Sequence, residues 1–461
     1  MERTFAVDTP KKVKEKVILK GWVNARRDHG KLVFIDLRDR SGVVQLVGEE
    51  KLGKLRASDV IEVEGLVRKR PQNLFNPNLA TGEVEIGVEK IKILARAQQL
   101  PFDILSDGYQ IGEEIRLKYR YLDLRRPRLI RNLEKRHKVI KFIRDWLDKK
   151  GFIEIETPIL TKATPEGARD FVVPSRLQPG KFYALPQSPQ QYKQLLMVAG
   201  FEKYYQIARC FRDEDPRADR AYGEFTQLDL EMSFVSQEEI LSLIEELFKE
   251  ITKEIFPKKK LTFSSFPRLD YDEVMKKYKT DKPDLRKNKN DPNELAFCFI
   301  INFPLFEWKE NENRWDAMHH PFTAPKEEDI PDLMAKRNIE KLKSYQHDFV
   351  LNGYEIGGGS LRITDPKIQT KIFEIMGHHP KQIKAKFGHL LEAFKFGVPP
   401  HGGIACGLDR FLSIVLNELS VRETIAFPMS SSGQTAVMEA PSFLSQEQLE
   451  ELNLIKKQKN R

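Results

Sequence analysis

The sequence predicts an α+β protein with two folded parts, a small N-terminal β-barrel and a larger domain in which strands and helices alternate. The chain has 461 residues, more than one hydrophobic core usually organises. Up to about residue 100, apolar and polar residues alternate with period two, as in strands. From Ile130 onward, apolar residues recur at helical spacing.

The composition is that of a globular protein with a modest excess of positive charge. Lys and Arg outnumber Asp and Glu by 77 to 68, which suits a polyanionic partner but equally a solvated basic surface. The three cysteines (Cys210, Cys298 and Cys406) lack zinc or redox spacing, so we expect reduced structural thiols. The longest apolar run, residues 295–306, is too short and interrupted to cross a membrane. With no apolar signal segment at the start, we expect a cytoplasmic protein without a membrane partner.

Residues 1–100 contain the strands of the predicted barrel. Alternation is clear in residues 61–67 and 84–88, and residues 33–37 and 43–47 form further short apolar segments between turns. About five short strands indicate a small barrel, for which an oligonucleotide-binding (OB) barrel is one candidate.

The later part divides by composition. Residues 101–129 form a linker or hinge with an Arg-rich and Tyr-rich stretch, which fits a solvated linker and an RNA or protein interface equally well. Residues 130–442 begin with a helix ending at Gly151, followed by a strand at residues 152–158. A polar loop is expected at about 282–294, and residues 443–461 are a tail with one helix, Gln446 to Leu454, and a basic end.

Two clusters suggest phosphate chemistry. Arg212 and Glu214 lie two residues apart and share one face of a strand, near aromatic residues that suit a nucleotide base; a surface ion pair is the alternative. Residues 399–416 form a glycine-rich strand that leads into a helix. Arg410 near the start of that helix suits an anion site, whereas a helix cap by Asp409 is the alternative.

Two further clusters suggest a metal and a substrate. Asp348, Glu355 and Arg362 surround the glycines at 357–359, and two carboxylates beside a glycine-rich backbone suit Mg²⁺. The pair His319 and His320 has no ligand at zinc spacing, which leaves a substrate-contacting loop or plain surface.

Together these clusters resemble, in order and in sequence, the class II aminoacyl-tRNA synthetases. CFRDEDPRADR (210–220) resembles motif 2, GGIACGLDR (402–410) motif 3, and residues 152–158 motif 1, a strand at the dimer interface. TPEGARDF, QSPQQYKQLLM, HHPFTAP and NGYEIGGGSLRI resemble the bacterial aspartyl-tRNA synthetases, as does GWVNARRDHGKLVFIDLRDRSGVVQLV in the barrel. The resemblance implies an anticodon-binding OB barrel, a catalytic domain built on an antiparallel sheet flanked by helices, and a homodimer.

The resemblance also implies a reaction and its residues. ATP would activate L-aspartate to aspartyl-adenylate, and the aspartyl group would pass to the 3′ end of tRNA. Arg212, Glu214 and Arg410 would be catalytic, and Asp348 and Glu355 would hold Mg²⁺. ATP would be bound by Arg212, Asp213, Glu214, Phe225, Glu355, Gly407, Leu408, Asp409 and Arg410. Aspartate would be bound by Glu166, Gln190, Lys193, Arg212, His319, His320 and Arg362, with Arg362 on its side-chain carboxylate.

For tRNA, the resemblance implies anticodon contacts from Arg27, His29, Phe34 and Gln45. Histidine at position 29 resembles the relaxed enzymes that charge both tRNA-Asp and tRNA-Asn. A discriminating enzyme for tRNA-Asp alone is the alternative.

The chain departs from this pattern in two places. The short loop at 282–294 leaves no room for the usual insertion domain between motifs 2 and 3. The motif 2 loop is one residue longer, and Ala221 or Tyr222 replaces a glutamine that usually contacts ATP. Rival interpretations are an asparaginyl- or lysyl-tRNA synthetase, a non-catalytic relative, and a tRNA-independent asparagine synthetase. Arg362 with Lys193, the complete set of motif residues and the barrel favour the aspartyl enzyme.

Overall fold

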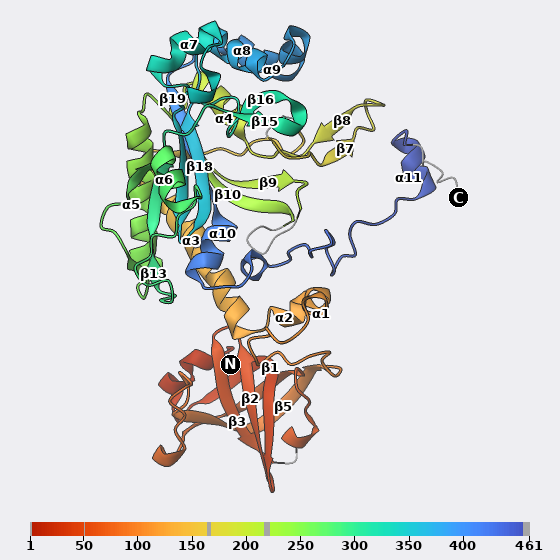
Figure 1. The fold of residues 1–461 in the computed structure, drawn as a ribbon. Helices are drawn as coiled ribbons and strands as arrows, with labels where there is room; N and C mark the ends of the chain where they lie inside the picture. The colour runs from red at the N-terminus through yellow and green to blue at the C-terminus, as the bar shows by residue number, and fades with distance from the viewer. Residues whose placement is uncertain (1, 50, 164–166, 216–221, 455–461) are drawn as a thin grey trace. The chain divides into compact units, whose positions relative to one another are not determined.

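A computed structural model describes residues 2–49, 51–163, 167–215 and 222–454 of the chain (Figure 1). The chain divides into two compact units, Met1–Asp103 and Ile104–Arg461. Each unit has its own hydrophobic core.

The first unit is a closed β-barrel with strand order β1-β2-β3-β5-β4, which confirms the predicted barrel. Neighbouring strands are antiparallel except for β3 and β5, which are parallel. Val33, Ile35 and Leu37 are buried inside the barrel, and Phe34 and Asp36 between them face outward, as the alternation predicts. The strands are β1 (Lys16–His29), β2 (Leu32–Asp39), β3 (Gly42–Gly48), β4 (Val60–Lys69) and β5 (Val84–Ala95).

The second unit is built on an eight-stranded sheet in the order β12-β14-β17-β18-β19-β10-β9-β6. The central pairs are antiparallel, as predicted, whereas the edge pairs β12/β14 and β6/β9 are parallel. The strands are β6 (Ile153–Glu154), β9 (Lys203–Arg212), β10 (Gly223–Ser233), β12 (Arg268–Asp270), β14 (Phe297–Ile301), β17 (Gln346–Leu351), β18 (Tyr354–Leu361) and β19 (His401–Gly407).

The edge strand β6 is shorter than the predicted strand at residues 152–158. Pairing covers Ile153 and Glu154, and Ile155 adds one backbone hydrogen bond to Tyr205. Pro158 has no N–H with which to continue the ladder.

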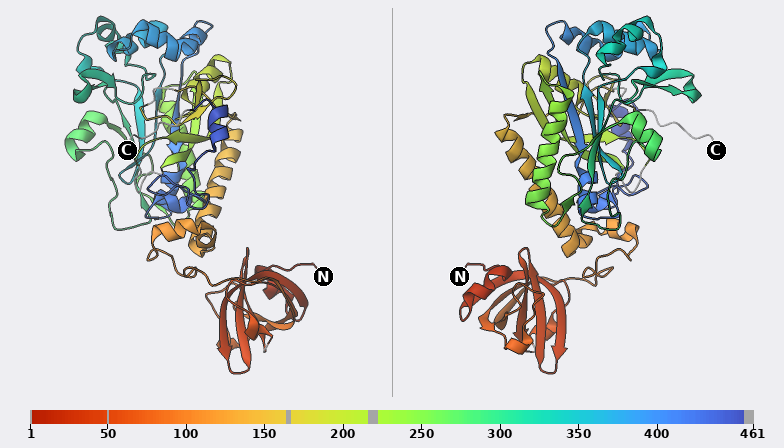
Figure 2. Two further views of the ribbon diagram at one scale, coloured as in Figure 1. Left: turned by 90° about the vertical axis from the view of Figure 1, so that its right-hand side faces the viewer. Right: turned by 60° about the vertical axis from the view of Figure 1, so that its left-hand side comes forward.

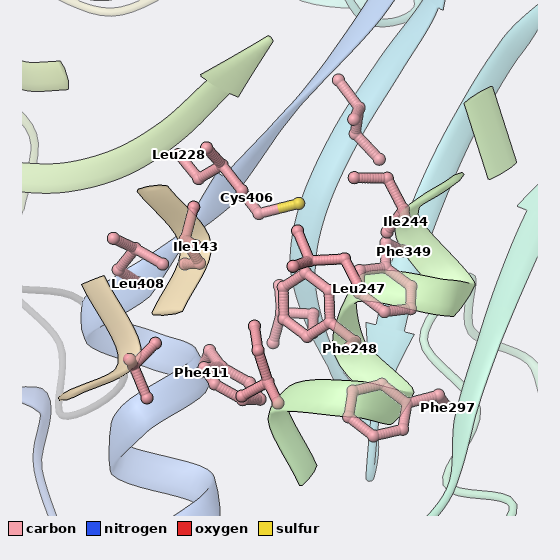
Figure 3. Close-up of a cluster of buried hydrophobic side chains, with 14 of the residues drawn as sticks. Ile143, Leu228, Ile244, Leu247, Phe248, Phe297, Phe349, Cys406, Leu408 and Phe411 are labelled. Carbon is pink, nitrogen blue, oxygen red and sulfur yellow. The ribbon is translucent and has the colours of Figure 1, made fainter. Parts of the chain in front are cut away.

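One face of the sheet is covered by the helices α3 (Pro127–Lys149) and α5 (Gln237–Ile255). Figure 3 shows Leu247 and Phe248 of α5 close to Phe349 of β17, and Phe411 of α10 (Leu408–Val415) completes this core. Figure 2 shows the two helices beside the sheet from two further sides. These helices therefore cover the apolar face of the sheet, and the polar side chains of the strands lie on the opposite face.

Strand β10 shows this division most clearly. Leu228, Leu230 and Met232 belong to the hydrophobic core, while the alternate residues Asp229 and Glu231 are buried on the opposite face.

In the connector before α3, three arginines of the Arg-rich stretch are buried around one carboxylate. The carboxylate of Asp123 accepts hydrogen bonds from Arg116 at 3.0–3.1 Å, Arg120 at 2.8 Å and Arg126 at 2.6 Å. All four side chains are buried, and Arg116 also pairs with Glu423. These arginines neutralise buried carboxylates within the second unit.

The polar loop expected at 282–294 is anchored at its end. The carboxylate of Glu294 accepts hydrogen bonds from the backbone N–H groups of Lys287 and Asn288, both at 2.8 Å. The C-terminal helix is α11 (Gln446–Glu451), three residues shorter than predicted at its end.

Among the described residues, the remaining α-helices number seven, and the remaining strands form three two-stranded sheets. The helices are α1 (Glu113–Lys118), α2 (Arg120–Asp123), α4 (Gln190–Val198), α6 (Tyr271–Tyr278), α7 (Ile330–Ala335), α8 (Pro366–Ile375) and α9 (Pro380–Phe394). Two-stranded sheets pair β7 (Val172–Pro174) with β8 (Phe182–Ala184), β11 (Lys260–Leu261) with β13 (Glu294–Leu295), and β15 (Phe306–Lys309) with β16 (Arg314–Ala317). In the described part of the chain, no helix combines the length and apolarity needed to span a bilayer.

Candidate active site

A cavity of about 360 Å³ lies on the polar face of the large sheet. Its walls come from β9, β10, β18 and β19, from the N-terminal residues of α4 and α10, and from the segment around His319. Most residues predicted from the sequence line it, namely Gln190, Lys193, Arg212, Glu214, Phe225, His319, His320, Glu355, Arg362, Gly407, Asp409 and Arg410.

Three predicted residues that the structure describes lie outside the cavity lining. Asp213, Asp348 and Leu408 are not among the side chains that line the cavity, and Leu408 belongs to the hydrophobic core. Glu166 lies outside the described residues, as does Ala221 of the motif 2 loop.

Two buried cations lie at one end of the cavity, each held by carboxylates of β10. Arg362 donates to both oxygens of Glu231, at 2.8 Å from Nε and 3.2 Å from Nη2. Lys193 Nζ lies 2.6 Å from Asp229 Oδ1 and 3.1 Å from Glu231 Oε2. Glu231 therefore joins the two cations, and their orientation is set by strand β10.

Asp229 and Glu231 were missed by the sequence analysis. The signal was available, because Gln227, Asp229 and Glu231 alternate with apolar residues over positions 227–232. Such a pattern in a buried strand places polar groups on a single face.

The pKa values of these two carboxyl groups are shifted in opposite directions. Burial tends to raise the pKa of Glu231, but Arg362 and Lys193 outweigh it and lower that pKa to about 2. For Asp229, burial dominates over Lys193, and the pKa of its carboxyl lies above its usual value. Asp229 Oδ2 is buried without a hydrogen-bond donor among the described residues, so it can accept from a cationic ligand.

The histidine pair is shifted toward its neutral form. Burial is the largest cause and lowers the pKa of both rings, and the charge of Arg362 lowers each further, while Glu355 opposes the shift at His319. His320 Nε2 lies 2.6 Å from Nη1 of Arg362, which also donates to Ser360 Oγ at 2.8 Å. Neutral rings supply polar atoms next to Arg362 without adding positive charge.

The other end of the cavity carries arginines beside an aromatic ring. The guanidinium of Arg212 lies over Phe225, 5.0 Å from the ring centre, which is a cation–π contact. Arg212 Nε is buried and finds no acceptor within the described part of the chain. Arg410 donates from Nη1 to the backbone carbonyl of Glu355, which fixes it at the start of α10. This end can hold phosphate or carboxylate groups against a planar ring.

Asp348 and Glu355 fit the chemistry of a magnesium site. Burial raises the pKa of the Asp348 carboxyl well above its usual value, and the charge of Glu355 raises it further. A divalent cation would relieve this repulsion. Glu355 lines the cavity and its Oε2 lies 3.5 Å from Lys282 Nζ.

Any such ion would draw most of its ligands from elsewhere. Within residues 2–454, apart from those not described, no group of three or more His, Cys, Asp or Glu side chains is placed to hold a metal. Two carboxylates completed by phosphate oxygens and water are the arrangement that Mg²⁺ prefers.

Glycines 357–359 allow strand β19 and the carboxylate of Asp348 to approach β18 closely. A Cβ on Gly359 would lie 2.0 Å from the carbonyl oxygen of Gly403 on β19. A Cβ on Gly358 would lie 3.2 Å from Asp348 Oδ1 and 3.3 Å from His319. The close backbone approach predicted from these glycines is therefore present.

The four residues predicted to contact an anticodon lie together on β1–β3 of the barrel. Arg27 pairs across the strands with Phe34 and forms a bidentate ion pair with Asp36, at 2.7 and 2.8 Å. The rings of His29 and Phe34 meet edge to face at 5.7 Å. Arg27 also lies 3.5 Å from Gln45, so the four side chains form one continuous surface.

Comparison with known protein families gives matches in both units. Residues 112–431 match the family described as tRNA synthetases class II (D, K and N). Residues 17–94 match the OB-fold nucleic acid binding domain family.

Curated proteins match over nearly the whole chain. The aspartate–tRNA(Asp/Asn) ligase of Geobacillus sp. (strain WCH70) is 41% identical over 580 aligned positions, covering 97% of this chain and 96% of that protein. The aspartate–tRNA ligase of Staphylococcus carnosus is 40% identical, covering 95% and 96%. Because 580 positions exceed the 461 residues of this chain, the Geobacillus protein carries positions without a counterpart here, in agreement with the missing insertion domain.

A solved structure extends the similarity to the fold. Asparaginyl-tRNA synthetase from Pyrococcus horikoshii, complexed with asparaginyl-adenylate, matches with a TM-score of 0.74 at 25% identity, covering 93% of this chain and 98% of that one.

Proposed function

This chain belongs to the class II tRNA synthetases (D, K and N), and on that premise we propose that it activates L-aspartate with ATP and transfers it to tRNA-Asp and tRNA-Asn. The observation that carries the choice of amino acid is the pair of buried cations, Arg362 and Lys193, at one end of the cavity. The names of the bacterial relatives support the same amino acid and both tRNAs.

Selectivity for aspartate follows from charge. Arg362 is oriented by Glu231 and lines the cavity, where the second N–H of Nη2 would bind the side-chain carboxylate of aspartate. Asparagine would offer a neutral amide in place of the carboxylate, and the charged hydrogen bond to Arg362 would be lost. A site built for one polar group can discriminate by roughly 10⁴-fold.

The α-ammonium of the substrate needs a negative or polar partner. Asp229 lines the cavity and has a buried Oδ2 that no described residue donates to, so it would accept from this ammonium. Gln190 and the neutral rings of His319 and His320 would complete the pocket by hydrogen bonding.

In the activation step, the substrate carboxylate attacks the α-phosphorus of ATP and pyrophosphate leaves. Arg212 would hold both reacting groups, because its guanidinium lines the cavity and has a buried Nε–H still available. Phe225, Glu214 and Arg410 would bind the adenine and the outer phosphates. Mg²⁺ at Asp348 and Glu355 would neutralise phosphate charge when bound. Positioning and charge stabilisation dominate this chemistry, since the protein forms no covalent bond.

For tRNA recognition, we infer that Arg27, His29, Phe34 and Gln45 read the anticodon. Phe34 faces outward from the barrel and can stack on a base, which contributes about 1–3 kcal/mol. An enzyme restricted to tRNA-Asp is the second candidate, since the Staphylococcus carnosus relative carries the name aspartate–tRNA ligase without the second tRNA.

The resemblance of residues 152–158 to motif 1 supports a homodimer, and the exposed Ile153 in this segment suits an interface. We also place the protein in the cytoplasm, where its substrates occur.

Aminoacylation tests the proposal. The purified chain, ATP, Mg²⁺ and labelled aspartate are incubated with a tRNA-Asp transcript, and ester-linked label on the tRNA is counted. We expect charging of tRNA-Asp and no charging of a transcript with a lysine anticodon and identity elements. Failure to charge tRNA-Asp would overturn the proposed function.

A further inference from the structure

Arg136, in the middle of α3, contacts two residues that line the cavity, Asp409 and Thr226. Its Nη1 donates to Asp409 Oδ1, and its Nη2 donates to Thr226 Oγ1 at 2.9 Å. The side chain is only 18% exposed and does not line the cavity. Its charge therefore acts on the protein and not on a ligand.

A third hydrogen bond closes the group into a ring. The backbone N–H of Thr226 donates to Asp409 Oδ2 at 2.8 Å. Both oxygens of Asp409 are thus engaged, one by α3 and one by β10. The ring joins three elements at one point, and two of them, β10 and α10, form the phosphate end of the cavity.

The ring lies next to two residues that the proposed function assigns to ATP. Phe225 precedes Thr226 on β10, and Arg410 follows Asp409 on α10. Phe225, Thr226, Asp409 and Arg410 all line the cavity. The hydrogen bond from Thr226 to Asp409 therefore ties the backbone beside Phe225 to the residue before Arg410.

We propose that Arg136 is a positioning residue for ATP, which acts through Asp409 and Thr226 to hold Phe225 and Arg410 at the spacing that the nucleotide needs. The inference rests on the proposed function for the identity of the nucleotide. Without Arg136, a buried carboxylate loses its charged partner and must turn toward water or another donor. A shift of about 1 Å at the start of α10 is enough to weaken binding strongly.

This positioning role predicts weaker binding of ATP but not of aspartate. The cations proposed to bind aspartate, Arg362 and Lys193, are held by other residues of β10. We expect Arg136→Met to weaken ATP binding about tenfold and Arg136→Lys, which can bond only one of the two acceptors, about threefold. The KM for aspartate in ATP–pyrophosphate exchange should stay within twofold for both variants. Arg131→Met, on an exposed residue of the same helix, should match the wild type.

The experiment combines calorimetric titration of ATP into the free protein with exchange kinetics and thermal unfolding. Unchanged ATP affinity in a folded Arg136→Met variant would overturn the inference, as would equal losses for ATP and aspartate. Should that variant not fold, Arg136→Lys decides, and wild-type ATP affinity in it overturns the inference. ATP titration needs no amino acid, so a wild-type protein that binds ATP but fails to exchange with aspartate refutes the proposed function alone.

Discussion

Arg362 is the residue on which the choice of amino acid depends. We predict that Arg362→Leu lowers aspartate-dependent ATP–pyrophosphate exchange by at least 10³-fold, because the substrate carboxylate then has no buried guanidinium to pair with. The matched control is Arg337→Leu, on a side chain that is 67% exposed, which should leave exchange unchanged. Exchange retained with aspartate in a folded Arg362→Leu variant would remove the assignment.

The buried ion pairs of Glu231 lead to a prediction about the free energy of unfolding and its dependence on pH. Its replacement by Gln leaves Arg362 and Lys193 without their shared anion, so we expect a loss of about 2–4 kcal/mol in the free energy of unfolding at pH 7. The folded-state pKa of about 2 lies below the ordinary value of 4.5, so this stabilisation is complete above pH 4.5 and is lost as the pH falls toward 2.

The comparison of wild type and Glu231→Gln by urea unfolding from pH 7 to pH 3.5 tests both parts. The difference in free energy should shrink by roughly 1 kcal/mol at pH 3.5. A difference that stays constant, or grows, as the pH falls would show that Glu231 is not the anion that stabilises the two cations.

At the scale of elements, the site depends on how closely β10 and β19 approach. A Cβ on Gly403 would lie 2.1 Å from the carbonyl oxygen of Leu230 and 2.2 Å from Glu231 Oε2. We predict that Gly403→Ala destabilises the protein by about 2 kcal/mol or more and weakens aspartate binding, because the strand must move and displace Glu231.

Gly388→Ala is the matched control in helix α9. A Cβ there meets nothing closer than Lys384 Cγ at 3.6 Å, so alanine should be neutral or stabilise by about 0.5–1 kcal/mol. Chemical unfolding of both variants measures the contrast. Equal stability of the two would mean that the close strand approach is not a constraint.

The periodicity of apolar residues predicted the strands and helices whose burial pattern is contained within a single segment of the chain. Alternation in residues 33–37 and 61–67 was enough for the barrel strands, and the 3.6-residue period after Ile130 was enough for α3. The strand at 152–158 was predicted too long, because the extent of edge pairing depends on the partner β9 and not on the segment itself.

The residues around the cavity divide in the same way. Motif residues such as Arg212 and Arg410 could be chosen from the sequence by resemblance, and they line the cavity together. Asp229 and Glu231 could not be assigned to Lys193 and Arg362, since these pairs join positions 36 and 131 residues apart. In the cluster around Asp123, the arginines are three and seven residues away, and only the pair of Arg116 with Glu423 joins distant parts of the chain.

At the scale of the whole molecule, the two compact units would have separate roles. The barrel would read the anticodon, and the larger unit would perform the chemistry. We predict that the chain charges tRNA-Asn transcripts at a rate within about tenfold of tRNA-Asp, because the surface at His29 and Phe34 would tolerate either base at the last anticodon position. Rates on tRNA-Asn equal to those on a lysine tRNA would instead indicate a discriminating enzyme.

In the proposed function, the buried cations Arg362 and Lys193 select aspartate for activation. The most direct measurement is ATP–pyrophosphate exchange by the wild-type chain with aspartate, asparagine and lysine in parallel, without tRNA. Our account predicts rapid exchange with aspartate and rates at least 10³-fold lower with the other two. Exchange driven by asparagine or lysine as well as or better than by aspartate would contradict it.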